Sequence, residues 1–320
     1  MENRDCGILV SYQCNAACRH CFLACSPKRS GGYMTPEIVE RICHLLKERG
    51  IKSVHIGGGE PFLNFEGLMK VIETVHRLGF KIDYVETNGF WVADEETALA
   101  YLTALKKAGV KQLLISLDPY HAEYVPIALP LRLVELCQRF ELEYILLKET
   151  FQELLAGIDH DKIYSRAELE KEISPQYVLE VAKSYGLSWS GRSVRIEAEY
   201  STHRPLDEIV AISEPCRYLL KTKLFHIDVY ERYVMTCTGI AFPLVDAIRG
   251  IPKGKYPVLE TLVAKGPAGL LAYAKDLGFK EENTYPSPCS LCFHIRHWLS
   301  ENGDLLELDS EYYQEALAHY

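Results

Sequence analysis

Residues 7–21 read GILVSYQCNAACRHC, an apolar run that leads directly into three closely spaced cysteines. Residues 7–12 have the length and composition of a short buried strand. Cys14, Cys18 and Cys21 follow with the spacing C-x3-C-x2-C. Thiolates this close in sequence can ligate one compact iron–sulfur cube, because sulfur is the ligand that such clusters prefer. The stretch therefore predicts a strand that carries a cysteine loop at its carboxyl end.

One alternative arrangement gives the same spacing. If residues 14–25 formed an amphipathic helix, Cys14, Cys18, Cys21 and Cys25 would all lie on one buried face. The loop is favoured because a strand ends just before Cys14 and most of the intervening residues are polar or small. We therefore prefer an iron–sulfur site to a packed helix.

Downstream of the cysteine loop, the chain repeats a strand followed by a helix, which is typical of a parallel βα array. Polar or Gly-rich tripeptides end three strands, at 57–59, 86–88 and 116–118. In such folds the reactive groups gather at the carboxyl ends of the strands. Six strands fit an open, partial barrel. Strands are predicted at 7–12, 53–58, 81–87, 111–118, 143–147 and 193–200, and helices from Thr35-Pro36 onward and at 65–78, 94–108, 126–140 and 174–185.

These motifs, taken in order, resemble the radical SAM superfamily. Each is weak alone, since Gly-rich and Asn-Gly turns are ordinary loop chemistry. Together, and one βα unit apart, they are specific, and the resemblance covers roughly residues 7–200. The matching residues are Cys14, Cys18 and Cys21 with Phe22 beside them, Gly58-Gly59-Glu60-Pro61 (the GGEP motif), Thr87-Asn88-Gly89 (the TNG motif) and Ser116-Leu117-Asp118 (the SLD motif).

The resemblance implies an α/β fold with a partial (β/α)6 TIM-like barrel. It implies that the three cysteines hold a [4Fe–4S] cluster with one open iron, at which S-adenosylmethionine binds and is cleaved reductively to methionine and a 5′-deoxyadenosyl radical. By analogy, Gly58, Gly59 and Glu60 would hold the methionyl ammonium, and Ser116 and Asp118 would contact the ribose. The other expected cofactor contacts are Phe22, Thr87 and Asn88.

Cys25 is a fourth cysteine near the first three. It could complete a four-cysteine site, as in a ferredoxin, and that would close the open iron. We expect a loop cysteine instead, because the family motif does not require it and the GGEP and TNG motifs would then lack a purpose.

A second cysteine set lies in the last third of the chain. Cys289 and Cys292 form a C-x2-C pair, and Cys216 and Cys237 flank a predicted hairpin. Four thiolates suit either a structural Zn²⁺ or a fully ligated [4Fe–4S] cluster. The order of these cysteines resembles the C-terminal twitch or SPASM extensions of radical SAM enzymes. Since residues 293–320 contain no cysteine, the shorter twitch type with one auxiliary cluster fits better.

Several further residues are candidates for the site. His121, Lys148 and Glu149 follow predicted strands and are weak catalytic candidates, as is Cys137, although its apolar helical neighbours favour core packing. Glu197 and Glu199 alternate on the predicted sixth strand. One of these two should face the lumen and contact cofactor or substrate.

Composition limits the class of protein. Hydrophobic residues make up 48% and charged residues 25%, as in a globular chain, and the net charge of −9 gives no general attraction to nucleic acid or anionic lipid. No apolar stretch is long enough for a membrane span, and the start lacks the apolar core of a signal peptide, so we expect a cytoplasmic protein with reduced cysteines. The expected organisation is a radical SAM barrel at 1–200, a linker at 201–215 and a smaller α+β cluster-binding domain at 216–320, with residues 148–173 as an insertion near the barrel mouth.

The resemblance points to an anaerobic enzyme that takes a hydrogen atom from a peptide or amino-acid-like substrate. It also implies a reductant such as flavodoxin or ferredoxin. Because the first strand begins near residue 7, we expect no N-terminal peptide-binding module. The barrel mouth, residues 148–173 and the C-terminal domain would then bind the peptide, or a separate protein would do so. Two alternatives stay open: radical chemistry on a small metabolite, and an iron–sulfur electron carrier or zinc-stabilised binding protein.

Overall fold

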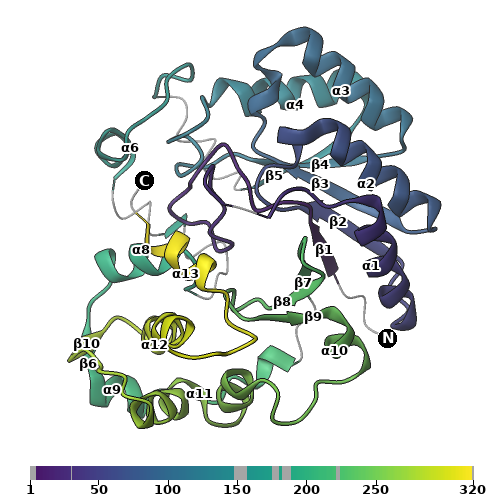
Figure 1. The fold of residues 1–320 in the computed structure, drawn as a ribbon. Coiled ribbons are helices and arrows are strands. Elements are labelled where there is room, and N and C mark those ends of the chain that lie inside the picture. Colours follow the sequence, from purple (N-terminus) through teal and green to yellow (C-terminus); the bar gives the residue numbers. More distant parts are fainter. Residues whose placement is uncertain are drawn as a thin grey trace.

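A mostly parallel sheet forms the centre of the computed structural model, which describes residues 5–29, 31–147, 157–174, 180–181, 189–220 and 224–318. Its strand order is β5-β4-β3-β2-β1-β7-β8-β9 (Figure 1). Strands β1 to β5 and β7 run parallel, and β8 and β9 are antiparallel to their neighbours. The α/β class is therefore confirmed. The strands are β1 Asp5–Leu9, β2 Ser53–Gly57, β3 Lys81–Thr87, β4 Gln112–Ser116, β5 Glu143–Leu147, β7 Leu224–Ile227, β8 Arg232–Val234 and β9 Ala241–Pro243.

Amphipathic helices connect the first five strands and cover one side of the sheet (Figure 1). In the first of them Val39, Ile42 and Leu46 recur at helical spacing and are fully buried. A proline at the first helical position is compatible with the start of that helix, since it needs no amide donor there. These elements confirm the predicted strand–helix alternation. The helices are α1 Pro36–Glu48, α2 Phe65–Arg77, α3 Glu95–Lys107 and α4 Ala128–Phe140.

The predicted sixth strand is wrong. Residues 193–200 form helix α8, Ser193–Tyr200, and the parallel neighbour that β1 gains on its free edge is β7 instead. Alternating apolar residues suggested a strand, but Val194 packs against Phe293 and Tyr313 of the C-terminal helices rather than in the sheet. Arg, Glu and Ala in this segment also have good helix propensity.

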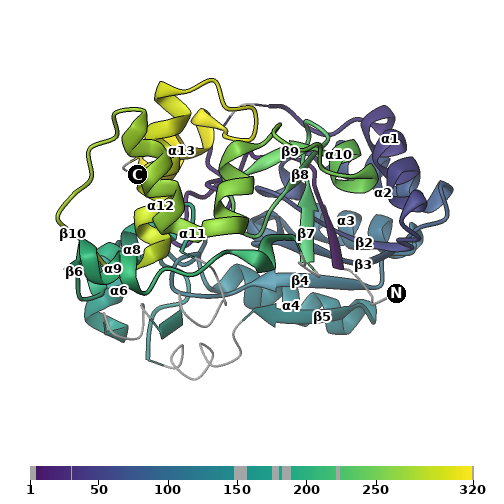
Figure 2. The same ribbon diagram turned by 90° about the horizontal axis from the view of Figure 1, so that it is seen from below.

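The C-terminal part contributes to two apolar cores. Phe225 and Ile227 of β7 join the core of the parallel strands, whereas a second core lies around α11 Pro257–Asp276 and α12 Pro288–Asn302. The predicted hairpin is confirmed as β7 and β8, and α11 bends at Gly266. Helices α12 and α13, Ser310–Leu317, lie far from α1 and α2 in both views (Figure 2).

The segment predicted as a linker contains structure of its own. It forms the short strand β6, Arg204–Pro205, which pairs with β10, Thr284–Tyr285, and then helix α9, Leu206–Ala211. The predicted boundaries at 201–215 stay a prediction. Of the predicted insertion, 148–156 lies outside the described residues, and the remainder includes helix α6, Arg166–Ile173; helix α10 is Leu244–Arg249. Most of the helix predicted at 174–185 also lies outside the described residues.

None of the described helices combines the length and apolarity that crossing a bilayer requires.

Candidate active site and second cysteine site

The first cysteine set lies on an irregular loop, so the helical alternative is wrong. Cys14 N donates to Ser26 O at 3.1 Å and Cys21 N donates to Cys18 O at 3.0 Å, contacts that fold the loop back on itself. Cys14, Cys18, Cys21 and Cys25 all line one cavity of about 360 Å³ at the carboxyl ends of the parallel strands. The structure thus brings the three predicted ligands together, and it adds Cys25 to the same wall.

A buried arginine from a distant part of the chain holds the carbonyl groups of this loop. Arg192 donates through its backbone N to Cys21 O at 3.1 Å, through Nε to Cys18 O at 2.9 Å and through Nη2 to Cys25 O at 2.5 Å. It is only 3% exposed and itself lines the cavity. A hydrogen bond with Cys25 lowers the pKa of Cys21, and the positive charge of Arg192 lowers it further. The loop therefore favours an anionic sulfur at Cys21.

Two glycines allow the end of β2 to approach the cysteine loop. Gly59 N donates to Ser11 O at 2.7 Å, and a Cβ on this glycine would lie 2.0 Å from Gln13 O. Gly58 has φ +138°, which side chains rarely allow. The Gly-Gly pair of the motif is therefore needed for close backbone contact.

Glu60 is the centre of a buried hydrogen-bond network. Its Oε1 accepts from Phe62 N at 3.1 Å and from Thr87 Oγ1 at 3.0 Å, and its Oε2 accepts from Asn88 N at 2.7 Å. Burial raises the pKa of this carboxyl to about 7, against the opposing effect of those donors. Asn88 Nδ2 donates in turn to Asn15 Oδ1 at 2.8 Å. The GGEP and TNG motifs and the cysteine loop thus form one connected wall.

The SLD motif divides between the cavity and the protein interior. Ser116 lines the cavity, whereas Asp118 does not and is fully buried. Asp118 Oδ1 accepts from Tyr120 N at 2.8 Å and from His121 N at 3.0 Å, and Oδ2 lies 2.7 Å from His121 Nδ1. Asp118, predicted to contact the ribose, instead accepts hydrogen bonds within the turn that follows it and orients the imidazole of His121.

His121, a weak catalytic candidate from the sequence, lines the cavity, and its imidazole interacts with Cys18. Burial opposes a charge on this imidazole, but Asp118 and Cys18 together raise its pKa well above the usual value. The ligand atoms of His20, Asp118 and His121 lie within 4.8 Å of one another. Because Asp118 and His121 are already in direct contact, we interpret the group as hydrogen-bonded rather than metal-binding.

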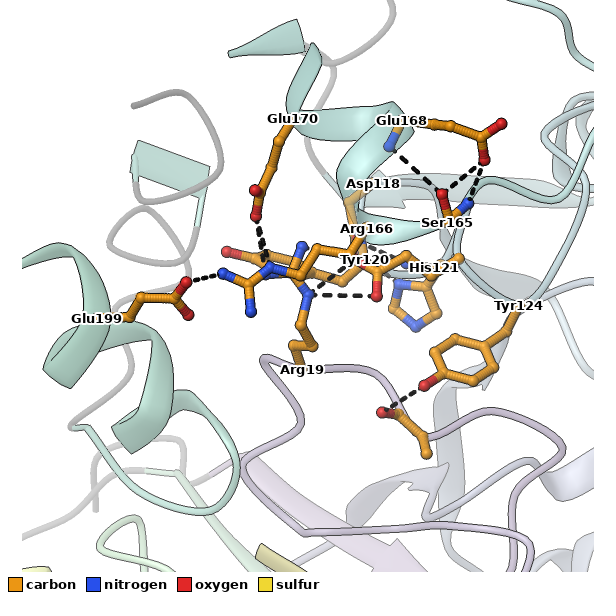
Figure 3. A network of polar contacts seen from close by, with 12 residues as sticks. Arg19, Asp118, Tyr120, His121, Tyr124, Ser165, Arg166, Glu168, Glu170 and Glu199 are labelled. Carbon is orange, nitrogen blue, oxygen red and sulfur yellow. Dashed lines mark hydrogen bonds and ion pairs between the residues drawn. The ribbon is translucent and has the colours of Figure 1, made fainter. Parts of the chain in front are cut away.

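Two neighbouring residues after β4, Glu123 and Tyr124, contact the cysteine loop (Figure 3). Arg19 forms a 2.7 Å ion pair with Glu123, and Tyr124 Oη donates to Ala17 O at 3.1 Å. Arg19 also reaches Glu170 of α6 at 3.5 Å. The loop is therefore fixed by side chains from two other parts of the chain.

Four predicted site residues lie away from the cavity. Glu199 is exposed and pairs with Arg166 (Figure 3), and Cys137 is fully buried in the core on α4. Glu197 is buried on α8, near Cys289, where burial raises its pKa to about 7. Since α8 is a helix, Glu197 and Glu199 do not alternate between two faces as they would on a strand. Asp118 is the fourth, and Lys148 and Glu149 lie outside the described residues.

The cavity floor contains residues that sequence reasoning missed. His55, Tyr84 and Glu86 line it from β2 and β3, and His226 lines it from β7. These residues could have been found from strand alternation, because residues two apart on a strand face the same side. His55 is two residues from Gly57, and Glu86 is two residues from Tyr84. A Cβ at Gly57 would lie 2.4 Å from Glu86 Oε2, so the glycine makes room for that carboxylate.

The second cysteine set is also brought together. Cys216 precedes the 3₁₀ turn Arg217–Leu220, Cys237 follows β8, and Cys289 and Cys292 lie in the first turns of α12. Burial and the neighbouring Cys237 raise the pKa of Cys216 to about 11. Burial raises the pKa of Cys289 to about 12, with contributions from Cys237 and Cys216. Cys216, Cys237 and Cys289 likewise raise the pKa of Cys292, as does burial. Four thiols from three parts of the chain therefore lie within electrostatic reach of one another.

Comparison with known proteins places the first cysteine set in a recognised domain. A model described as the radical SAM superfamily matches residues 8–139. The "putative peptide biosynthesis protein YydG" of Bacillus subtilis (strain 168) is 30% identical over 125 residues, 39% of this chain and 39% of that protein. A probable GTP 3′,8-cyclase of Methanothermobacter marburgensis is 28% identical over 116 residues, 36% of this chain and 35% of that protein.

These alignments span less than two fifths of the relatives' own length. Among solved structures, that of BtrN in complex with AdoMet and 2-DOIA has a TM-score of 0.47 at 12% identity, and the superposition covers 83% of this chain and 89% of BtrN.

Proposed function

We propose that this protein, whose residues 8–139 match a model of the radical SAM superfamily, is a radical SAM enzyme that abstracts a hydrogen atom from a peptide or amino-acid-like substrate. The observation that carries the proposal is the single cavity lined by Cys14, Cys18 and Cys21 together with Gly58, Gly59, Glu60, Thr87, Asn88 and Ser116. A protein that only carries electrons would not need a ligand cavity with a buried carboxylate beside its cysteines.

The residues present fit the two groups that the family implies. Three thiols on one loop suit a [4Fe–4S] cluster with one iron left for a ligand, and Phe22 lies beside them on the cavity wall. Bound there, the cluster and S-adenosylmethionine supply a one-electron reductive cleavage that yields a 5′-deoxyadenosyl radical. The protein contributes position and the exclusion of water.

Glu60 and its neighbours would hold the methionyl end of S-adenosylmethionine. A carboxylate has about four acceptor sites, and Glu60 uses three of them on Phe62, Thr87 and Asn88. One site is left for an ammonium group. The backbone of Gly58 and Gly59 is accessible for further contacts because neither residue has a side chain, and Ser116 lies on the same cavity wall for a ribose hydroxyl.

A peptide is the substrate class that we propose. The alignment with YydG, whose name describes peptide biosynthesis, supports it over 39% of this chain. The alignment with a GTP 3′,8-cyclase supports the alternative of a small-molecule substrate. A flavodoxin- or ferredoxin-like reductant and a separate peptide-recognition protein complete the proposal.

We further propose that residues 216–320 are a twitch or SPASM-like domain with an auxiliary [4Fe–4S] cluster on Cys216, Cys237, Cys289 and Cys292. The convergence of these four thiols from elements far apart in sequence supports a shared ligand. Structural zinc is the alternative, since four thiolates also satisfy Zn²⁺.

Deuterium transfer tests the proposal. The full chain, reconstituted anaerobically and reduced, is incubated with S-adenosylmethionine and candidate peptides labelled with deuterium at Cα and at side-chain carbons. Deuterium should appear in 5′-deoxyadenosine from one of the peptides. If only a labelled small metabolite transfers deuterium, the peptide assignment is wrong. If S-adenosylmethionine is cleaved but neither the peptides nor the metabolites transfer deuterium, the radical SAM activity stands and both substrate assignments fail.

A further inference from the structure

Arg296 is a fully buried cation beside the second cysteine set. It lies on α12 four residues after Cys292 and seven after Cys289, so the three side chains share one face of the helix. Arg296 is 0% exposed and is among the largest fully buried side chains of the chain. A charge in this position needs a partner, because burial removes its hydration.

The neighbouring groups accept hydrogen bonds from only one of the three nitrogen atoms of this guanidinium. Nη1 donates to Thr238 O at 2.9 Å and to Tyr313 Oη at 3.0 Å. Nε and Nη2 have no hydrogen-bond partner in the described part of the chain, and no carboxylate there forms an ion pair with Arg296. Both acceptors are neutral, and the guanidinium carbon lies 5.9 Å from the ring centre of Phe293 and 5.7 Å from that of Tyr313. These contacts provide no anion, and the N–H groups of Nε and Nη2 are left without an acceptor among the described residues.

The cysteines are the groups near Arg296 that could become negative. Cys237 and Cys292 interact with its charge most strongly among the four, and Cys216 and Cys289 also do so. A thiol carries no charge, but a cysteine bound to a metal is deprotonated. A thiolate-ligated metal group is therefore an anion in the place where Arg296 lacks one.

We propose that Arg296 is the internal counter-charge and hydrogen-bond donor of the metal group held by Cys216, Cys237, Cys289 and Cys292. This inference rests on the proposed metal-binding role of those cysteines. Arg296 acts as a positioning residue as well, because its bond to the carbonyl of Thr238 fixes the residue next to Cys237. Thr238 Oγ1 donates in turn to Phe22 O at 2.6 Å, beside the first cysteine loop.

The proposal predicts how the metal group should depend on charge at position 296. Arg296→Met removes the charge and all donors, Arg296→Gln keeps a donor without the charge, and Arg296→Lys keeps the charge. Tyr313→Phe is the matched control, because it removes one acceptor of Nη1 and leaves Nε and Nη2 unchanged. Arg296→Gln and Arg296→Lys keep the test decisive if Arg296→Met fails to fold.

The experiment measures metal content and reduction potential in full-length chains reconstituted with iron and sulfide. The first cluster is removed by Cys14→Ala, Cys18→Ala and Cys21→Ala, so that the remaining signal belongs to the second site. Relative to the parent, Arg296→Met and Arg296→Gln should lose iron or show a lower midpoint potential, since a lost cation disfavours the more negative reduced cluster. Arg296→Lys should recover most of the potential, and Tyr313→Phe should match the parent.

Four outcomes would contradict the proposed role of Arg296. If the parent binds metal and Arg296→Gln binds the same amount at the same potential, Arg296 is not the counter-charge. If Tyr313→Phe shifts the potential as much as Arg296→Gln, the effect is structural and the inference fails. If the parent holds neither iron nor zinc, the metal-binding role of the four cysteines fails, and the inference fails with it. Should the parent hold zinc, the same variants are compared by chelator competition, and equal zinc retention would overturn the inference.

Discussion

The two cysteine sites are built in opposite ways. In the first, Cys14 to Cys25 lie on one loop directly after β1, and a buried arginine from a distant segment, Arg192, binds their carbonyls. In the second, each of Cys216 and Cys237 comes from a separate element, and the buried arginine, Arg296, lies on the same helix as Cys289 and Cys292. A local loop fixes its ligands by backbone turns, whereas a dispersed site depends on correct packing of the helices that supply it.

The largest effect is expected from removing the first site alone. Cys14→Ala, Cys18→Ala and Cys21→Ala in one chain should abolish 5′-deoxyadenosine formation and lower the iron content from about eight to about four per chain, the values for two and one [4Fe–4S] clusters. Iron analysis and product assay check this. Complete loss of iron would show that the two sites do not form independently.

A second variant tests whether each buried arginine serves its own site. Arg192→Met removes charged hydrogen bonds to Cys18 O and Cys25 O, a loss of roughly 2–5 kcal/mol in the free energy of unfolding. We expect loss of the first cluster and its product with the second site still occupied. Thermal unfolding and metal analysis measure both effects, and equal loss of metal from both sites would contradict the comparison.

The difference between the two cysteine sites also explains which features of the structure could be predicted from the sequence. The first site was predicted because its ligands and motifs lie at short, fixed spacing after strands, so local patterns carry the information. The segment 193–200 was wrongly predicted as a strand because its alternation is satisfied by packing on C-terminal helices, a tertiary effect that propensity does not report. The same holds for β7, whose pairing with β1 joins residues more than two hundred apart, and for His226 on the cavity floor.

Arg296 was missed for a related reason. Nothing in the sequence distinguishes it from the other arginines until α12 is packed against Thr238 and Tyr313. The convergence of Cys216 and Cys237 on Cys289 was predicted from the hairpin that they flank and from the family resemblance.

A pH series tests the burial of Glu60 in the first site. The pKa of Glu60 is raised to about 7, against about 4.3 in an unfolded chain, so between these values the native state binds more protons than the unfolded state. Stability of the chain without cofactors should therefore fall as pH rises from about 4.3 to 7, by roughly 3 kcal/mol in total. Glu60→Gln should lack this fall. Denaturant unfolding of both chains at several pH values measures it, and parallel curves would contradict the burial of an ionisable Glu60.

The smallest effect is expected at Cys25. It shares the cavity wall with the proposed ligands and hydrogen-bonds to Cys21. Cys25→Ser keeps a donor at this position, so the chain should retain most of its iron and its product. A loss as large as that of Cys21→Ser, the matched variant, would make Cys25 a ligand and the first site a closed four-cysteine centre.

The central claim is that the cavity beside Cys14, Cys18 and Cys21 binds and cleaves S-adenosylmethionine. The most direct measurement is the amount of 5′-deoxyadenosine formed from S-adenosylmethionine by the anaerobically reconstituted, dithionite-reduced chain, with iron content determined on the same sample. We predict product from the wild type and none from Glu60→Ala, which keeps all three cysteines. A wild-type sample with a fully assembled first cluster and no 5′-deoxyadenosine would contradict the claim.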